Sequence, residues 1–375
     1  MNNLTTYVGL DVHKSFISVA VFLPGQKKAI DFKAGTEGKA IRKLSSKLHD
    51  LAKGKVEACY EAGCFGFGLK RQLDKLGISC KVIAPSMIPI MPGDRVKTDK
   101  RDARKLGRLL KARQLTEVSP PSQEQEAVRS VCRAREQIQK DVISWKHRIS
   151  KFLLFRGLVY RDGKEWTNAH QQWLRRIQLS EPADQIVFDM YLRGLTESLC
   201  MYDEMVANIE ELAEIEPYFT AVSYLRCLRG IDTITAFSIV TELFAFFRFE
   251  NPRALMAYLG VTPAEHSTSG DPKRFGMTKV GNKRIRRLLI QASWHQTKPL
   301  RSSARLRNRR SGQPGWVIAI AKKAESRLHR RYWALVKKNK RSVKAIGAVA
   351  REMAGFIWAL LYQLELDRLE DRKAA

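Results

Sequence analysis

The first 117 or so residues alternate between short apolar segments and amphipathic segments, and this alternation most constrains the fold. The helix-like segments run from Phe67 to Leu76, ending at Gly77, and from about Thr98 to Arg113. Apolar segments with the length and alternation of half-buried strands precede the first of these helix-like segments and separate it from the second. The predicted strands are Tyr7–Asp11, Ile17–Phe22, Val56–Tyr60 and Ile78–Ala84. Strands that alternate with helices in this way predict an α/β layer.

A Ser-Pro-Pro-Ser break at Ser119–Ser122 ends this region. Residues 123–155 and roughly 183–215 then have helical periodicity with mixed charges, which predicts a coiled-coil hairpin for oligomerisation or partner binding. From about Tyr218 the composition changes again, towards a mainly helical region. We therefore expect three parts: residues 1–118, 119–217 and 218–375.

The charge of the chain indicates its class of partner. The 375 residues include 67 Lys and Arg but only 38 Asp and Glu, a net charge of +29. Between Gly270 and Arg351 there are 24 Lys and Arg residues and two acids, Asp271 and Glu325. A solvated face would carry both signs, so the bias predicts a surface that binds the phosphates of nucleic acid. An anionic membrane is the competing partner.

Membrane and extracellular assignments are disfavoured by the sequence. Nothing at Met1–Leu10 is typical of a signal peptide. The longest apolar run, Ala345–Leu364, is interrupted by Arg351 and Glu352 and predicts a buried amphipathic helix. The six cysteines have no CxxC pair, which argues against structural zinc and a disulfide framework and favours free, mostly buried thiols in a reducing cytoplasm.

Four acidic residues stand at positions suited to a metal site. Asp11 and Glu61 each end a predicted strand, and Asp99 and Asp102 begin a predicted helix, three residues apart on one face. Phosphoryl transfer uses hard oxygen ligands that hold Mg²⁺ near the phosphate. The alternative is structural, with Asp99 or Thr98 as a helix cap and Asp11 as a turn residue.

A second motif, Leu228–Ala236 (LRGIDTITA), has the pattern of a helix-hairpin-helix. In such a motif a glycine turn presents backbone N–H groups to a DNA phosphate. A plain pair of packed helices is an equally good interpretation of this sequence.

A third motif is the Ser/Thr/Gly segment Gly260–Gly270, which contains His266, Ser267 and Ser269. A serine beside many cations could attack a phosphate and have its alkoxide stabilised. A simple loop between helices is the alternative. The neighbouring candidate nucleic-acid-binding residues are Lys273, Arg274, Lys279, Lys283, Arg284, Arg286 and Arg287.

Taken together, these motifs resemble a known family. GLDVHK at Gly9–Lys14, EAG at Glu61–Gly63 and KTDKRDA at Lys97–Ala103 are similar to the amino-terminal half of the DEDD transposases of the insertion-sequence one-ten family, which includes the site-specific invertase Piv. LRGIDTITA, LMAYLGVTPAEHSTSG and TKVGNKRIRRLL resemble its carboxy-terminal half. The predicted helices of residues 119–217 match the family in helical character only, not in sequence motifs.

The resemblance implies a RuvC-like, RNase H-type first domain with Asp11, Glu61, Asp99 and Asp102 as Mg²⁺ ligands. It also implies that Ser269, the serine before a glycine, forms a covalent phosphoserine link to DNA. The partners would be donor and target DNA, a structured bridge RNA that pairs with both, and further copies of the chain, from dimer to tetramer. Composite active sites would assemble in that oligomer, in a bacterial, nucleoid-associated setting.

This sequence departs from the family pattern where many members read QSG or SSG, because it reads Ser267-Thr268-Ser269-Gly270. Ser267 is therefore an alternative nucleophile. The basic segment after Leu300 also extends beyond the part of the chain that the family pattern covers. Three other classes remain to be weighed: a structure-specific nuclease with no covalent intermediate, a non-enzymatic nucleic-acid binder and an anionic-membrane protein. The acid quartet argues against the binder, and the lack of a cationic interfacial helix argues against the membrane protein.

Overall fold

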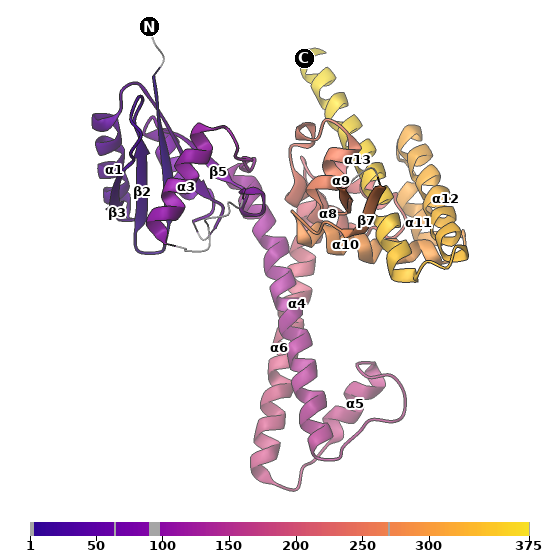
Figure 1. Ribbon diagram of the computed structural model, residues 1–375. Coiled ribbons are helices and arrows are strands. Elements are labelled where there is room, and N and C mark those ends of the chain that lie inside the picture. The colour runs from indigo at the N-terminus through magenta and orange to yellow at the C-terminus, as the bar shows by residue number, and fades with distance from the viewer. Residues whose placement is uncertain (1–3, 64, 90–97, 269–270, 375) are drawn as a thin grey trace. The chain divides into compact units, whose positions relative to one another are not determined.

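The computed structural model describes residues 4–63, 65–89, 98–268 and 271–374 (Figure 1). The chain divides into two compact units, Met1–Pro121 and Ser122–Ala375. Residues 119–217, expected as a separate part, fall almost entirely in the second unit. Each unit has its own buried apolar core.

The amino-terminal unit is built on a five-stranded sheet with the order β3-β2-β1-β4-β5. The first three strands are antiparallel neighbours, whereas β4 runs parallel to both β1 and β5. The α/β layer predicted from the alternation of patterns is confirmed. The strands are β1 Thr5–Val12, β2 Ile17–Phe22, β3 Ile30–Ala34, β4 Lys55–Glu61 and β5 Ser79–Ile83.

Helices cover both faces of this sheet. The larger apolar core joins one face to α1 (Gly38–Leu51) and α2 (Gly68–Lys75). The other face packs against α3 (Asp99–Lys111), through Cys59 and Ala20 among others. A short 3-10 helix, η1 (Pro85–Met87), follows β5. The strand β3 and the helix α1 were not among the elements predicted from sequence.

Helix α3 lies unusually close to the central strand because Gly9 has no side chain. A Cβ on Gly9 would lie 2.0 Å from the carbonyl oxygen of Ala103 and 2.4 Å from the backbone nitrogen of Gly107. Both atoms belong to α3, so the backbones of β1 and α3 meet at this point. The close approach fixes where the first turn of α3 lies along the carboxyl end of β1.

The second unit begins with two long helices that pack side by side, as predicted, with a short helix, α5 (Asn168–Arg176), between them in sequence. The long helices are α4 (Gln123–Phe155) and α6 (Pro182–Ala213). Helix α4 starts in a capping box, in which Ser122 and Gln125 satisfy each other's backbone N–H groups. Phe188 and Leu195 of α6 pack with Ile149 of α4 in a separate apolar cluster.

The rest of this unit is a helical core with one β-hairpin. Its elements are α7 (Phe219–Arg226), α8 (Thr233–Leu243), η2 (Phe246–Arg248), α9 (Pro252–Tyr258), β6 (Pro263–Thr268), β7 (Asp271–Met277), α10 (Lys283–Ser293), η3 (Trp294–Thr297), α11 (Ala304–Arg310), α12 (Gly315–Lys337) and α13 (Ser342–Ala374). The segment expected to be a Ser/Thr/Gly loop between helices is therefore a two-stranded antiparallel hairpin.

Helix α13 is the core helix that the sequence predicted between Ala345 and Leu364. Among the described helices it is the one long and apolar enough to cross a membrane by length and composition, and half of its apolar window is buried inside the protein. Ile346, Met353 and Ile357 are at most 1% exposed and pack in the core of the unit. The apolar character of α13 is thus accounted for by protein packing.

Candidate active site

Two of the predicted acids lie side by side at one edge of the sheet. Strands β1 and β4 are parallel and paired, with Leu10 opposite Tyr60, so Asp11 and Glu61 occupy the next position on each strand. Side chains alternate along a strand, which places both acids on the face that also carries Gly9 and Cys59. That face is the one covered by α3, because the Cys59 thiol lies 3.7 Å from the carbonyl oxygen of Leu106.

The other two acids lie in the first turn of α3. Thr98 caps this helix by accepting a hydrogen bond from the backbone N–H of Arg101. The carboxylates of Asp99 and Asp102 are therefore near the positive end of the helix dipole, where negative charge is stabilised. The sequence left open whether Thr98 or Asp99 caps this helix, and the structure shows that Thr98 does. The carboxylates of Asp99 and Asp102 are therefore not used for capping.

His13, which follows β1 in the sequence and was not predicted as a site residue, joins the two elements. His13 Nε2 lies 2.9 Å from Asp11 Oδ2 and 3.4 Å from Asp99 Oδ1. Asp11, His13 and Asp99 each offer a ligand atom, and these atoms lie within 4.8 Å of one another. The signal in the sequence was the i, i+2 spacing of Asp11 and His13 at the end of a strand, which puts both side chains on one face.

The electrostatics of this group suit a bound cation. Burial raises the pKa of the Asp11 carboxyl above its ordinary value; the hydrogen bond and charge of His13 oppose this, and Asp102 and Asp99 raise it further. Three carboxylates thus repel one another around Asp11. A divalent cation would offset that repulsion, and carboxylate oxygens are the ligands that Mg²⁺ prefers. The carboxylates of this group therefore suit a divalent cation.

The structure brings the four predicted ligands together to different degrees. Asp11 and Asp99 share the group with His13, and Asp102 is close enough to raise the pKa of Asp11. Glu61 is exposed at the neighbouring strand end and does not belong to the group.

The alternative serine nucleophile, Ser267, belongs to the hairpin of the second unit. Ser267 is in β6, paired with Pro272 of β7, and Thr268 pairs with Asp271. Ser269 and Gly270, which follow Thr268 in the sequence, lie outside the described residues, as do the side chains of His266, Ser267, Lys273 and Arg274.

The base of this hairpin is held firmly by its own backbone. Thr278 N donates to Thr262 O at 2.9 Å, and Lys279 N donates to Gly260 O at 3.1 Å. The guanidinium of Arg286 donates to the carbonyl oxygens of Leu259 and Val280, at 2.9 and 3.0 Å, on the two sides of the base. Arg286 therefore connects α10 to both ends of the hairpin.

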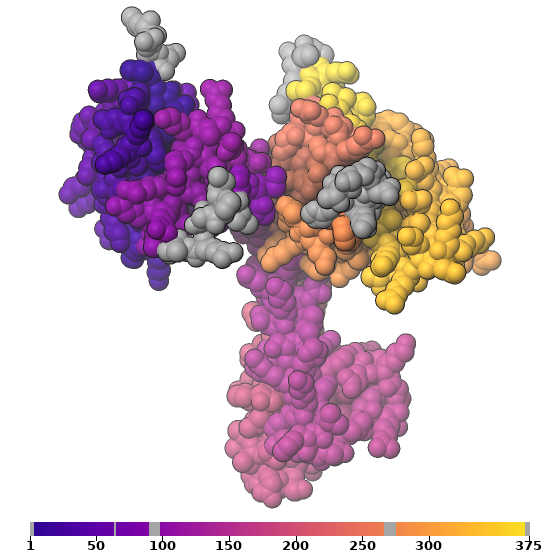
Figure 2. All heavy atoms as spheres, viewed as in Figure 1, coloured from indigo at the N-terminus to yellow at the C-terminus, as the bar shows by residue number. Residues whose placement is uncertain are grey.

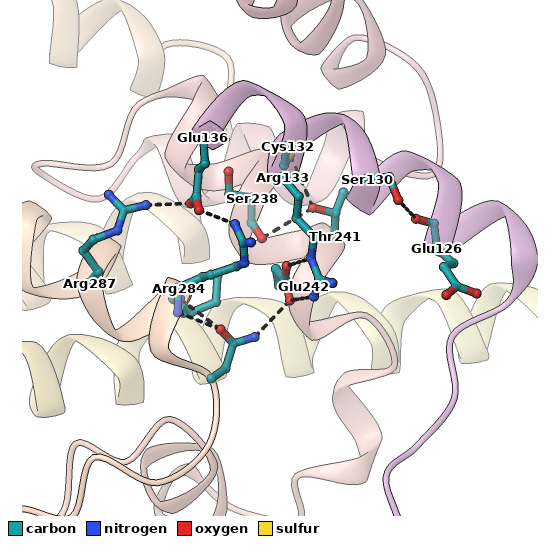
Figure 3. Close-up of polar contacts among 12 residues, drawn as sticks. Glu126, Ser130, Cys132, Arg133, Glu136, Ser238, Thr241, Glu242, Arg284 and Arg287 are labelled. Carbon is teal, nitrogen blue, oxygen red and sulfur yellow. Dashed lines mark hydrogen bonds and ion pairs between the residues drawn. The ribbon is translucent and has the colours of Figure 1, made fainter. Parts of the chain in front are cut away.

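A buried carboxylate ties the start of α10 to the long helix α4 (Figure 3). Glu242 of α8 is 4% exposed and accepts two hydrogen bonds from Arg133 of α4, at 2.7 and 3.0 Å. It also accepts one from Asn282, the N-cap of α10, at 3.0 Å. Next to it, Glu136 of α4 pairs with Arg284 and Arg287 (Figure 3).

These contacts divide the predicted nucleic-acid-binding residues into two kinds. Arg284, Arg286 and Arg287 are engaged by protein partners, which gives them a structural role. Lys279 and Lys283 are exposed and form no ion pair within the described part of the chain. Spacing alone could not separate the two kinds, because the partner Glu136 is about 150 residues away in sequence.

The segment Leu228–Ala236 does join two helices, α7 and α8, by a tight turn at Gly230. Gly230 has a φ of 90°, and a Cβ there would lie 2.4 Å from the carbonyl oxygen of Ala292 in α10. The carboxylate of Asp232 accepts a hydrogen bond from the backbone N–H of Thr235 at the start of α8. The turn is thus packed against protein with a negative charge at the helix start, which favours the interpretation as a pair of packed helices.

An acidic group at the carboxyl edge of a mixed sheet, in a chain with a large excess of cations, is typical of enzymes that act on nucleic acid. Comparisons with known proteins give the family. A family model for DEDD transposases of the IS110 type, described as "Transposase", matches residues 8–155, and a second, "Transposase IS116/IS110/IS902 family", matches residues 222–308.

Full-length relatives agree with these matches. The chain is 38% identical to the putative transposase y4qE of Sinorhizobium fredii over 94% of this chain and 88% of that protein. It is 34% identical to the transposase for insertion sequence element IS1533 of Leptospira borgpetersenii, over 90% of this chain and 99% of the relative. The chain belongs to the IS110 family of transposases, enzymes that cleave and recombine DNA.

Proposed function

We propose that this protein is the recombinase of an insertion sequence, which cuts and exchanges DNA strands with Mg²⁺ and a covalent phosphoserine intermediate. The observation that carries the proposal is the grouping of Asp11, His13 and Asp99 within 4.8 Å at the start of α3. A mixed sheet with acids at the carboxyl ends of β1 and β4 also supports the RuvC-like, RNase H-type assignment for residues 1–118.

In the proposed site, Asp11, Glu61, Asp99 and Asp102 would hold Mg²⁺, which when bound supplies charge neutralisation at the scissile phosphate. The protein's own contribution is placement. Gly9 lets α3 approach β1, so that Asp99 and Asp102 at the start of the helix lie near Asp11 at the end of the strand. His13 orients the Asp11 carboxylate by its hydrogen bond and lies between Asp11 and Asp99.

The proposed covalent step conserves a phosphodiester. Oγ of Ser269 forms a bond to phosphorus, the bond from phosphorus to one deoxyribose oxygen breaks, and that oxygen leaves as a strand-end hydroxyl. The serine proton passes to solvent and the leaving oxygen takes up a proton, so charge balances. Because the phosphoserine ester retains the energy of the broken linkage, a hydroxyl of another strand can attack its phosphorus. The bond from phosphorus to Oγ of Ser269 then breaks, the attacking hydroxyl loses its proton and the serine oxygen regains one, which restores a DNA phosphodiester and the free serine. Exposed lysines beside the hairpin, Lys279 and Lys283, would bind the strand.

Sequence choice in this proposal comes from a bridge RNA that pairs with donor and target DNA. The protein then needs mainly phosphate contacts and few contacts to base edges. The large positive charge of residues 270–351 supports that division of labour. A homo-oligomer, from dimer to tetramer, would bring two donor and two target strands together.

The test is a covalent-adduct assay with the full-length protein, its flanking non-coding RNA and DNA substrates. Wild type should give a protein–DNA adduct that survives denaturation, and Ser269→Ala should give none. Ser267→Ala is the matched control and should still give the adduct. An adduct from Ser269→Ala but none from Ser267→Ala would move the nucleophile to Ser267. Cleavage with no adduct in any variant would favour the alternative function, a structure-specific nuclease.

A further inference from the structure

A groove lies beside the β6–β7 hairpin of the second unit, which carries Ser267 and is called the serine hairpin below. Strand β7 forms one wall, and the end of α12 and the first turns of α13 form the other. The walls touch at the floor, where a Cβ on Gly347 would lie 3.6 Å from the Met277 sulfur. The volume of about 740 Å³ is within the range of small-molecule sites. Helices α12 and α13 are the orange-to-yellow part of Figure 2.

The inside of the groove is apolar. Val261, Leu335, Val343 and Ala348 line it, and Phe275 of β7 stands at its edge with 58% of the residue exposed. Val343 is 73% exposed, so the apolar surface continues out of the groove to solvent. Large apolar side chains exposed together in this way indicate a surface that binds something.

The rim of the groove is cationic. Lys279, Lys340, Lys344 and Arg351 line it, and no acidic residue does. None of these four side chains forms an ion pair within the described part of the chain. The rim therefore complements a polyanion, while the interior complements a flat apolar group.

We propose that this groove holds one unpaired nucleotide of the DNA strand on which the serine hairpin acts, with the base against Phe275 and the flanking phosphates on the lysine rim. This inference rests on the proposed function, in which the serine hairpin carries out the covalent step on a DNA strand. An aromatic platform with cations along a backbone path is how proteins bind single strands without reading sequence. Phe275 of β7 follows the candidate nucleophile Ser269 by six residues in the sequence.

An unpaired nucleotide fits better than an intact duplex. In a duplex the base faces are stacked and inaccessible, so a duplex would meet the rim but leave the apolar interior empty. Release of a strand end during recombination is the event that would supply an unstacked nucleotide next to the hairpin. We therefore expect the groove to hold the end of the cut strand until that end is joined to another DNA strand.

Photo-crosslinking tests this directly. Full-length protein carrying Asp102→Asn, without divalent metal, is mixed with single-stranded DNA containing one 5-iodouracil and irradiated, and the crosslinked peptide is sequenced. The crosslink should fall on Phe275. Because the inactive variant performs no chemistry, the result is independent of whether the protein is a recombinase. Conversely, if no covalent adduct forms in the test of the proposed function, the crosslinking result still shows whether the groove binds a nucleotide.

Affinity measured by fluorescence anisotropy gives the second arm. Phe275→Leu keeps the apolar bulk but not the ring and should weaken single-strand binding about tenfold, whereas Phe275→Tyr should bind as the parent does. Lys344→Ala should reduce the salt dependence of binding by about 0.7 in log–log slope. The matched controls are Phe247→Leu and Lys140→Ala, an exposed aromatic and an exposed lysine outside the groove, which should change neither value.

Three outcomes would overturn the proposal. The first is a crosslink elsewhere together with unchanged affinity of Phe275→Leu. The second is a fully paired duplex that competes as well as the single strand, which would show that no unstacked base is bound. The third is an RNA strand of the same sequence that binds ten times more tightly through Phe275, which would assign the groove to RNA.

Discussion

Gly9 of β1 and Gly107 of α3 face each other so closely that a Cβ on Gly9 would lie 2.4 Å from the backbone nitrogen of Gly107. This contact sets the distance between the strand that carries Asp11 and the helix that carries Asp99 and Asp102. The position of the acidic group therefore depends on a residue with no functional atoms of its own.

Gly9→Ala should displace α3 and disable the acidic group. The new Cβ would also lie 2.0 Å from the carbonyl oxygen of Ala103, and backbone cannot move aside cheaply. We expect loss of stability of about 1–3 kcal/mol, as for other overpacked sites, and loss of DNA cleavage. Gly38→Ala is the control, because a Cβ there meets nothing within 4 Å. Thermal unfolding and a cleavage assay measure both effects; unchanged cleavage by Gly9→Ala would contradict this role.

Asp11→Asn should abolish cleavage and yet stabilise the metal-free protein. Burial and the charges of Asp102 and Asp99 raise the pKa of Asp11, so its ionised form is disfavoured in the fold. Removal of that charge relieves the repulsion. Excess Mg²⁺ should raise the melting temperature of wild type, by an amount corresponding to about 2.7 kcal/mol at one hundred times the dissociation constant, and should affect the variant far less. Calorimetry with and without MgCl₂ decides this, and an equal response of both proteins would rule out Asp11 as a ligand.

Glu242→Gln should destabilise the second unit at neutral pH. Burial alone would raise the pKa of Glu242, but the hydrogen bond and charge of Arg133, the hydrogen bond of Asn282 and the charge of Arg129 lower it overall. The loss should fall somewhat below the roughly 3–5 kcal/mol of a fully buried broken pair, since the Arg133 side chain is 40% exposed.

The same substitution gives a signed pH dependence. A carboxyl whose pKa is lowered by folding contributes stability above its ordinary value of 4.5, and that contribution is lost as pH falls through the folded pKa. The difference between wild type and Glu242→Gln should therefore be largest near neutral pH and shrink below about pH 4.5. Glu204→Gln, at an exposed position of α6, serves as control. A difference that grows on acidification would show that Glu242 is not held ionised.

Lys283→Ala and Arg284→Ala, at adjacent positions, should have opposite consequences. Lys283 is exposed and without an ion pair in the described structure, so its loss should lower the salt slope of duplex binding by about 0.9 and leave stability unchanged. Arg284 pairs with Glu136, which is 14% exposed, and its loss should mainly reduce the melting temperature. Anisotropy titrations over a range of salt and thermal melts separate the two, and a salt slope that changes only in Arg284→Ala would reverse the assignment.

Local patterns predicted much of the amino-terminal unit and the first long helix of the second unit. Strand β2 spans the expected residues Ile17–Phe22, and α4 starts and ends where its periodicity does. The helix α1 was missed although Ile41, Leu44 and Leu48 lie on one helical face. The strand β3 was missed although its apolar and polar residues alternate, because it is only five residues long and mostly half-exposed. Signals of this kind are local, since they depend on which face of one element is buried.

The residue types of the candidate site were determined by the sequence alone: carboxylates at strand ends and a helix start, a serine next to glycine, and a basic carboxy-terminal half. Only the tertiary structure decided which of them work together. His13 joins Asp11 to Asp99 because α3 packs on β1, and Arg284 turns inward because Glu136 lies beside it, 148 residues away in sequence. Sequence spacing fixes which residues share an element, whereas the burial of apolar faces fixes which elements meet, and the chemistry of a site depends on both.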